Sequence, residues 1–217
     1  MIKAALFDMD GTITDTEKLN VRFWVEAGKV FGFDVADDDI IFIRSLEAKL
    51  CAEYLGRTYP GFDYYEVREE RRRLMREHVD RYGIEAKPGV REILDYLRQE
   101  GIKIGLATAT KYENAERYLK YLGIFDLFDE VICTSMVKRG KPLPDVYLYA
   151  CERIGAKPEE CLAVEDSPNG VRSAHDAGCI TVMIPDLTPV DEEMRGLIDA
   201  EASSLMELRD MLKNGTL

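Results

Sequence analysis

Apolar residues follow one another along this chain in two patterns, as short continuous runs and as repeats of three or four positions. Continuous, β-branched runs are typical of strands that are covered on both faces. One such run leads into Asp8 near the N-terminus. The same pattern predicts four more strands, over Ile102 to Thr108, Glu130 to Thr134, Cys161 to Glu165 and Ile180 to Ile184.

Helical repeats separate these predicted strands. In the first, Pro88 and Gly89 precede the apolar positions and Gly101 is placed to end the helix. The apolar face of that helix comprises Val90, Ile93, Leu94 and Leu97, and similar repeats cover Ala115 to Leu122, Val146 to Ile154 and Val171 to Ala177. Strands that alternate with helices predict an α/β fold with a parallel, Rossmann-like sheet and right-handed crossovers.

The stretch from about Asp15 to Lys87 contains no convincing buried strand. Thr14 to Glu17 has the form of a capping box, which predicts a helix that ends at Gly32. Its apolar face would comprise Leu19, Phe23, Ala27, Val30 and Phe31, and further helices are predicted over Asp37 to Cys51 and Asp63 to Tyr82. Such a stretch exceeds an ordinary crossover. We therefore expect a core domain of residues 1–14 and 85–217, with residues 15–84 inserted as a helical cap over the carboxyl edge of the sheet.

Composition narrows the classes of function. The formal charge of −12 over 217 residues argues against nucleic acid, because phosphate neutralisation needs a basic surface. The first apolar run is too short for a signal sequence or a membrane span. The five cysteines form no C-x-x-C pair, which fits reduced thiols in a cytoplasmic protein.

Polar side chains gather where the predicted strands end. The positions are Asp8 and Asp10, Thr108, Lys141, and Glu165 with Asp166. In an open parallel sheet the carboxyl ends of the strands converge on one crevice, where ligands bind. Carboxylates without paired histidines or cysteines favour Mg²⁺. A lysine and a hydroxyl beside that metal suit a phosphoryl group, so the pattern indicates phosphoryl transfer.

The same residues resemble the ordered motifs of the haloacid dehalogenase superfamily. Asp8-Met9-Asp10-Gly11-Thr12 is similar to its D-x-D-G-T signature. Thr108, Lys141 in Gly-Lys-Pro-Leu-Pro-Asp, and Glu165-Asp166-Ser167 with Asn169-Gly170 are similar to the second, third and fourth motifs. The insertion resembles the helical cap of the subgroup that contains β-phosphoglucomutase and phosphoglycolate-type phosphatases.

This resemblance implies a role for each motif residue. Asp8 would attack the substrate phosphorus and form an aspartyl-phosphate. Asp10 would protonate the leaving oxygen and then activate water. Mg²⁺ would be held by the Asp8 carboxylate, the Asp10 backbone carbonyl and Asp166, with Glu165 beside it or bridged to it by water. Phosphate oxygens would be bound by Thr108, the Ala109 amide and Lys141, which would also pair with Asp8.

The substrate is expected to be a small phosphomonoester, with a sugar phosphate first and a short phosphorylated acid second, on a monomeric protein. The residues that could contact it are Asn20, Arg44, Arg71, Arg72 and Lys111. Val67 to His78 is so rich in charge that a solvated helix face is the competing interpretation.

A phosphatase and a phosphosugar mutase are the two close alternatives. Asn20 stands where such mutases usually carry a cap-side histidine, and only part of their sugar-contacting loop is recognisable around Ile43-Arg44-Ser45. Asn20 cannot transfer protons as an imidazole does, so we favour the phosphatase. A receiver-like signalling domain also phosphorylates an Asp at a sheet edge, but receivers are shorter and lack the helical insertion.

Overall fold

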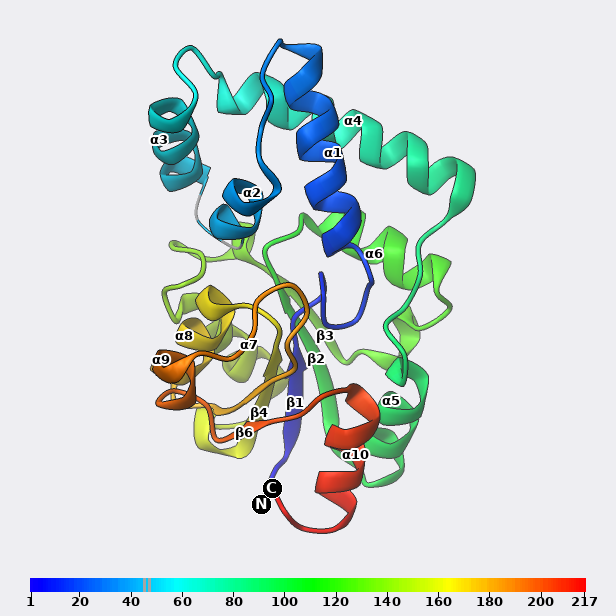
Figure 1. The fold of residues 1–217 in the computed structure, drawn as a ribbon. Helices are drawn as coiled ribbons and strands as arrows, with labels where there is room; N and C mark the ends of the chain where they lie inside the picture. Colours follow the sequence, from blue (N-terminus) through cyan, green and yellow to red (C-terminus); the bar gives the residue numbers. More distant parts are fainter. Residues whose placement is uncertain (45, 47) are drawn as a thin grey trace.

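The computed structural model describes residues 1–44, 46 and 48–217. Its centre is a parallel sheet in the order β3-β2-β1-β4-β5-β6 (Figure 1). The strands are β1 (Ala4–Phe7), β2 (Lys103–Thr108), β3 (Glu130–Cys133), β4 (Cys161–Glu165), β5 (Ile180–Met183) and β6 (Ala200–Glu201). The α/β prediction and its five strands are confirmed, and the two-residue β6 was not predicted. The strand order reverses beside β1, which opens a crevice at its carboxyl end.

Helices cover both faces of this sheet, as alternating strand side chains require. Phe7 of β1 points into the cluster packed by α5 (Val90–Gln99), α6 (Tyr112–Tyr121) and α10 (Leu205–Lys213). Leu6 points the other way, toward α7 (Asp145–Ile154) and α8 (Pro168–Ala177). The remaining short elements are α9 (Glu192–Arg195) and the 3₁₀ turns Phe125–Leu127, Thr134–Met136 and Pro158–Glu160. Both layers fix the strand ends in place.

Four further helices lie together beyond the carboxyl ends of the strands (Figure 1). We call them the helical group: α1 (Glu17–Val30), α2 (Asp37–Ile43), α3 (Ala48–Thr58) and α4 (Tyr64–Tyr82). They bury an apolar cluster of their own, in which Trp24 stacks on Tyr64 with ring centroids 5.3 Å apart. The C-terminal half of α4 instead packs, through Met75 and Val79, into the apolar cluster that contains Phe7 of β1. The helical group is therefore packed against the sheet layer as well as within itself.

Two helix predictions in this region were wrong. The helix predicted over Asp37 to Cys51 is two helices, because α2 ends at Ile43 and α3 begins at Ala48; the predicted positions 45 and 47 lie outside the described residues. On α1, Val30 is 64% exposed, and Trp24 is buried instead.

The capping box predicted for α1 is also absent. The Thr14 hydroxyl donates to the Met9 carbonyl at 3.1 Å, and the helix begins after Thr16 without a side-chain cap. Thr14 is thus part of the turn that follows β1, and the Glu17 side chain is not part of a capping box.

All five thiols are free and buried, so the cysteines are unpaired as predicted. None of the helices in the described ranges is both long and apolar enough to cross a membrane.

Candidate active site

The strand ends bring a lysine between two carboxylates. Asp8 follows β1 directly, and Glu165 is the last residue of the neighbouring β4. The Lys141 ammonium donates to Asp8 Oδ1 at 2.5 Å, to Glu165 Oε1 at 2.6 Å and to the Ala107 carbonyl at 2.9 Å. Because an ammonium has three donors, all of them are used and the cation is fixed in place.

Asp10 is held separately from this lysine. The Thr16 hydroxyl donates to its Oδ1 and the Thr110 hydroxyl to its Oδ2, each at 2.6 Å. The two aspartates of the D-x-D motif therefore have different partners, one cationic and one neutral. That difference allows them to have different chemical roles.

Gly11 lets the turn after Asp10 pass close to the next carboxylate. Its φ is +88°, and a Cβ there would lie 2.4 Å from Asp166 Oδ2. Only glycine accommodates both conditions.

Burial dominates the electrostatics of the cluster. Desolvation raises the pKa of Asp8 to about 7, with further increases from Glu165 and Asp10, although Lys141 opposes the shift. Desolvation likewise raises the pKa of Asp166 well above its usual value, against the Arg44 charge. Lys141 is the exception, because burial disfavours its charge but Asp8 and Glu165 still raise its pKa. The carboxylates of the site therefore outnumber its two buried cations, Lys141 and Arg44.

The donor set fits a hard divalent cation. Oxygen atoms of Asp8, Glu165 and Asp166 lie within 4.8 Å of one another. Glu165 Oε2 and Asp166 Oδ2 are buried and have no hydrogen-bond partner among the described residues. An unsatisfied buried carboxylate oxygen such as Glu165 Oε2 is costly, and a cation would satisfy it.

The second-motif threonine lies beside this cluster, fully buried at the end of β2. Thr108 Oγ1 accepts from the Thr110 amide at 3.0 Å, which turns the chain after the strand. Ala109, Thr110 and Lys111 then line a cavity between the sheet edge and the helical group.

That cavity has a volume of about 530 Å³. The residues predicted to contact substrate all lie on it: Asn20, Arg44, Arg71, Arg72 and Lys111. Arg71 donates to Asn20 Oδ1 at 2.6 Å and stacks over Trp24, and its Nε is buried without a hydrogen-bond partner. Arg72 is paired with Glu69 on the same helix. The charged stretch of α4 thus combines a cavity wall with a solvated helix face. Arg71 and Arg72 line the cavity, whereas Arg73 pairs on the exposed face with Glu70 and Glu77.

Several site residues were missed by the sequence patterns. Glu17, read as a capping residue, is buried 3.9 Å from Arg44, and desolvation raises its pKa to about 8. Tyr147 donates to Glu165 Oε1 at 2.6 Å, although its position on α7 indicated only core packing. Thr110 gave no signal beyond its place after β2.

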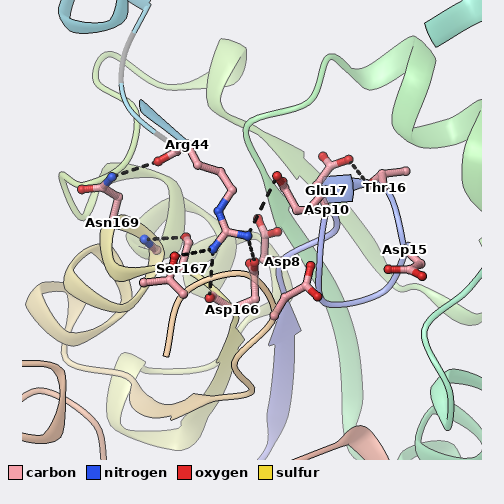
Figure 2. A network of polar contacts seen from close by, with 12 residues as sticks. Asp8, Asp10, Asp15, Thr16, Glu17, Arg44, Asp166, Ser167 and Asn169 are labelled. Carbon is pink, nitrogen blue, oxygen red and sulfur yellow. Dashed lines mark hydrogen bonds and ion pairs between the residues drawn. The ribbon is translucent and has the colours of Figure 1, made fainter. Parts of the chain in front are cut away.

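Arg44 crosses from the helical group into the acidic cluster (Figure 2). Its Nη1 lies 2.9 Å from Asp166 Oδ2, and Asn169 donates to its backbone carbonyl at 3.0 Å. Ser167, beside them, accepts from the Gly170 amide at 3.2 Å and so caps α8. The motif-four residues thus include structural positions as well as candidate ligands.

Comparison with known proteins agrees with this arrangement. A family model described as haloacid dehalogenase-like hydrolase matches residues 2–178. A phosphorylated carbohydrates phosphatase from Thermotoga maritima is 32% identical over 182 residues, covering 82% of each chain. A β-phosphoglucomutase from Bacillus subtilis is 29% identical over 196 residues, covering 87% of this chain and 86% of its own. The crystal structure of CbbY from Rhodobacter sphaeroides in complex with phosphate has a TM-score of 0.81 at 27% identity, covering 96% of each chain.

Proposed function

This chain belongs to the haloacid dehalogenase-like hydrolase family, and we propose that it is a Mg²⁺-dependent phosphatase of small phosphomonoesters that works through an aspartyl-phosphate. One observation carries the proposal: the Asp8 carboxylate is fixed by Lys141 at the sheet edge, within 4.8 Å of two further carboxylates. Phosphoryl transfer needs a carboxylate that attacks phosphorus, a cation fixed beside it, and a cluster of oxygen atoms that can bind a metal ion.

Asp8 is proposed as the nucleophile and Asp10 as the acid and base. A carboxylate oxygen of Asp8 forms a bond to phosphorus while the bond to the leaving oxygen breaks, and Asp10 gives that oxygen a proton. Asp10 then takes a proton from the water that cleaves the aspartyl-phosphate, which releases inorganic phosphate. The separate hydroxyl partners of Asp10 hold its carboxyl group for both proton transfers.

The metal would be held by Asp8, Asp166 and the Asp10 carbonyl, with Glu165 beside them. When bound, Mg²⁺ neutralises charge on the transferred phosphoryl group. Lys141 keeps the Asp8 carboxylate oriented, and it would bind a phosphate oxygen by exchanging one of its three hydrogen bonds for that oxygen. Thr108 and the Ala109 amide would donate to the other oxygens, at the point where the chain turns into the cavity.

Residues 15–84 are proposed to form the cap over a core of residues 1–14 and 85–217, and the substrate would be read where the two meet. The cavity of about 530 Å³ admits a small molecule, and Arg71, Arg72 and Lys111 supply positive charge on its wall. A phosphorylated sugar is the first candidate, because a phosphatase of phosphorylated carbohydrates is among the relatives. We propose that the protein acts as a cytoplasmic monomer.

The mutase alternative rests on the β-phosphoglucomutase relative. The observation against it is Asn20, which accepts a hydrogen bond from Arg71 at the cavity wall. A side-chain amide does not exchange a proton with a sugar hydroxyl at neutral pH. The receiver-like alternative does not fit a chain that matches the hydrolase family over residues 2–178.

A panel of small phosphomonoesters, assayed for phosphate release with Mg²⁺ and with excess chelator, tests the proposal. A β-glucose 1-phosphate isomerisation assay runs beside it. We expect Mg²⁺-dependent release from sugar phosphates and no isomerisation. Absence of release from every phosphomonoester would overturn the hydrolase, and isomerisation without release would favour the mutase.

A further inference from the structure

The guanidinium of Arg44 lies among the carboxylates of Asp166, Asp8 and Glu17, although the residue stands at the end of a helix of the helical group. It follows α2, and only 9% of the residue is exposed. Besides its contact with Asp166 Oδ2, it donates through Nη2 to the Asp166 carbonyl at 3.4 Å and to Thr188 Oγ1 at 3.1 Å. Figure 2 shows the side chain reaching down between Asp166 and Glu17. Arg44 thus brings a positive charge to a carboxylate of the candidate metal cluster.

The contact is a charge pairing of poor hydrogen-bond geometry. Nη1 and Asp166 Oδ2 are 2.9 Å apart, yet both are buried atoms without a hydrogen-bond partner, and so is Nε of Arg44. Arginine normally binds a carboxylate through two parallel hydrogen bonds. Here it acts as a point of positive charge, with unused donors that another acceptor could satisfy.

We propose that Arg44 and the divalent cation are alternative partners of Asp166, so that metal binding displaces the guanidinium into the cavity. The inference rests on the metal site of the proposed function. Two cations on one buried carboxylate repel each other strongly in a medium of low dielectric. The cation would lie among three carboxylates, those of Asp8, Glu165 and Asp166, whereas Arg44 pairs closely with only one.

The exchange needs only a side-chain movement. Asn169 holds the backbone carbonyl of Arg44, so the residue stays at the boundary when its guanidinium leaves. Arg44 also lines the cavity of about 530 Å³ and can turn toward it. The displaced guanidinium would then face a substrate anion, so metal binding would prepare the substrate site.

Metal affinity tests this directly. If Arg44 is paired with Asp166 most of the time, the cation can bind only the fraction of molecules in which Asp166 is unpaired. The apparent Kd for the cation is then the intrinsic Kd divided by that fraction. Calorimetric titration of chelator-stripped protein with MgCl₂ should therefore give about tenfold tighter binding for Arg44→Gln than for the unaltered protein. Arg68→Gln is the matched control, because Arg68 lines the same cavity but stacks on Tyr64. Its Kd should change by less than about twofold.

A second variant guards against misfolding of Arg44→Gln. Thr188→Val removes one acceptor of the guanidinium and leaves every carboxylate in place. It should tighten Mg²⁺ binding by about threefold, the worth of one ordinary hydrogen bond.

The outcomes separate this inference from the function on which it rests. Equal or weaker Mg²⁺ binding by Arg44→Gln and Thr188→Val, beside normal binding by the unaltered protein, would overturn the exchange alone. If neither the unaltered protein nor any variant binds Mg²⁺, the proposed metal site fails, and the exchange fails with it.

Discussion

The two walls of the cavity hold their charges in different ways. On the sheet side, the Lys141 ammonium has three acceptors and both oxygens of Asp10 accept hydrogen bonds. On the α4 side, Arg71 has one acceptor and a buried Nε without a hydrogen-bond partner. A wall whose groups are fixed suits one invariant reaction, and a wall with unused donors suits recognition of a variable ligand. Substitutions on the two walls should therefore affect different quantities.

The largest effect is expected at Asp8. Asp8→Asn should lower kcat by about four orders of magnitude or more, because it removes the proposed nucleophile. Thermal unfolding should show no loss of stability, since the desolvated Asp8 charge, whose pKa is raised to about 7, is itself unfavourable. Asp95→Asn, which alters an exposed partner of Arg91, is the control. Near-normal turnover by Asp8→Asn would remove the nucleophile assignment.

Loss of the sheet-side cation should affect stability and activity together. Lys141→Met leaves Asp8 and Glu165 without their shared partner, and breaking such a buried pairing costs about 3–5 kcal/mol. Urea unfolding measures this free energy, with Lys120→Met, at an exposed pair with Glu116, as the control. A variant as stable as its parent would mean that the sheet-side wall is not built around Lys141.

The α4 wall should respond in binding alone. Arg71→Gln is expected to raise KM about tenfold while changing kcat and the free energy of unfolding little, because it removes uniform binding of a substrate anion. Steady-state kinetics on the best phosphomonoester of the panel measures it. Arg73→Gln, on the same helix but paired outside with Glu70 and Glu77, should change neither constant. A fall in kcat without a change in KM would place Arg71 in the chemistry instead.

The smallest effect is a pH dependence of stability in the metal-free protein. Burial raises the pKa of Asp8 from 3.8 to about 7 and that of Glu17 from 4.5 to about 8. Between those values the folded protein binds protons that the unfolded chain has released, so stability falls as the pH rises from about 4 to about 8. With excess chelator, Tm should fall steadily as the pH rises over this range. Glu17→Gln should flatten the curve, and a Tm that rises over this range would contradict the sign.

The sheet side was predictable from sequence because its chemistry follows strand ends. A continuous apolar run locates a buried strand, and the next polar residue must then lie at the crevice, as Asp8 and Asp166 do. Lys141 needed the order of motifs as well, because it stands on a loop eight positions after the end of β3.

The helical side was less predictable because its important contacts are long-range. Glu17 satisfies the spacing of a capping box, and nothing local distinguishes that use from its burial beside Arg44. The break between α2 and α3 was missed because the apolar spacing continues across it. Arg44, at this break, pairs with Asp166, which is far away in sequence, so no local pattern reports the contact. The apolar repeat of a helix shows which face is buried. It does not show that a polar side chain of that region contacts a distant part of the fold.

The central claim, that Asp8 carries the phosphoryl group, can be measured at the residue itself. The protein with Mg²⁺ is mixed with p-nitrophenyl phosphate, quenched in acid during turnover and reduced with borohydride, which converts an aspartyl-phosphate to homoserine. Peptide mass spectrometry then locates the change. We predict homoserine at position 8 and aspartate retained at positions 10 and 166. Homoserine at another aspartate, or continued turnover with position 8 unmodified in every quenched sample, would contradict the account.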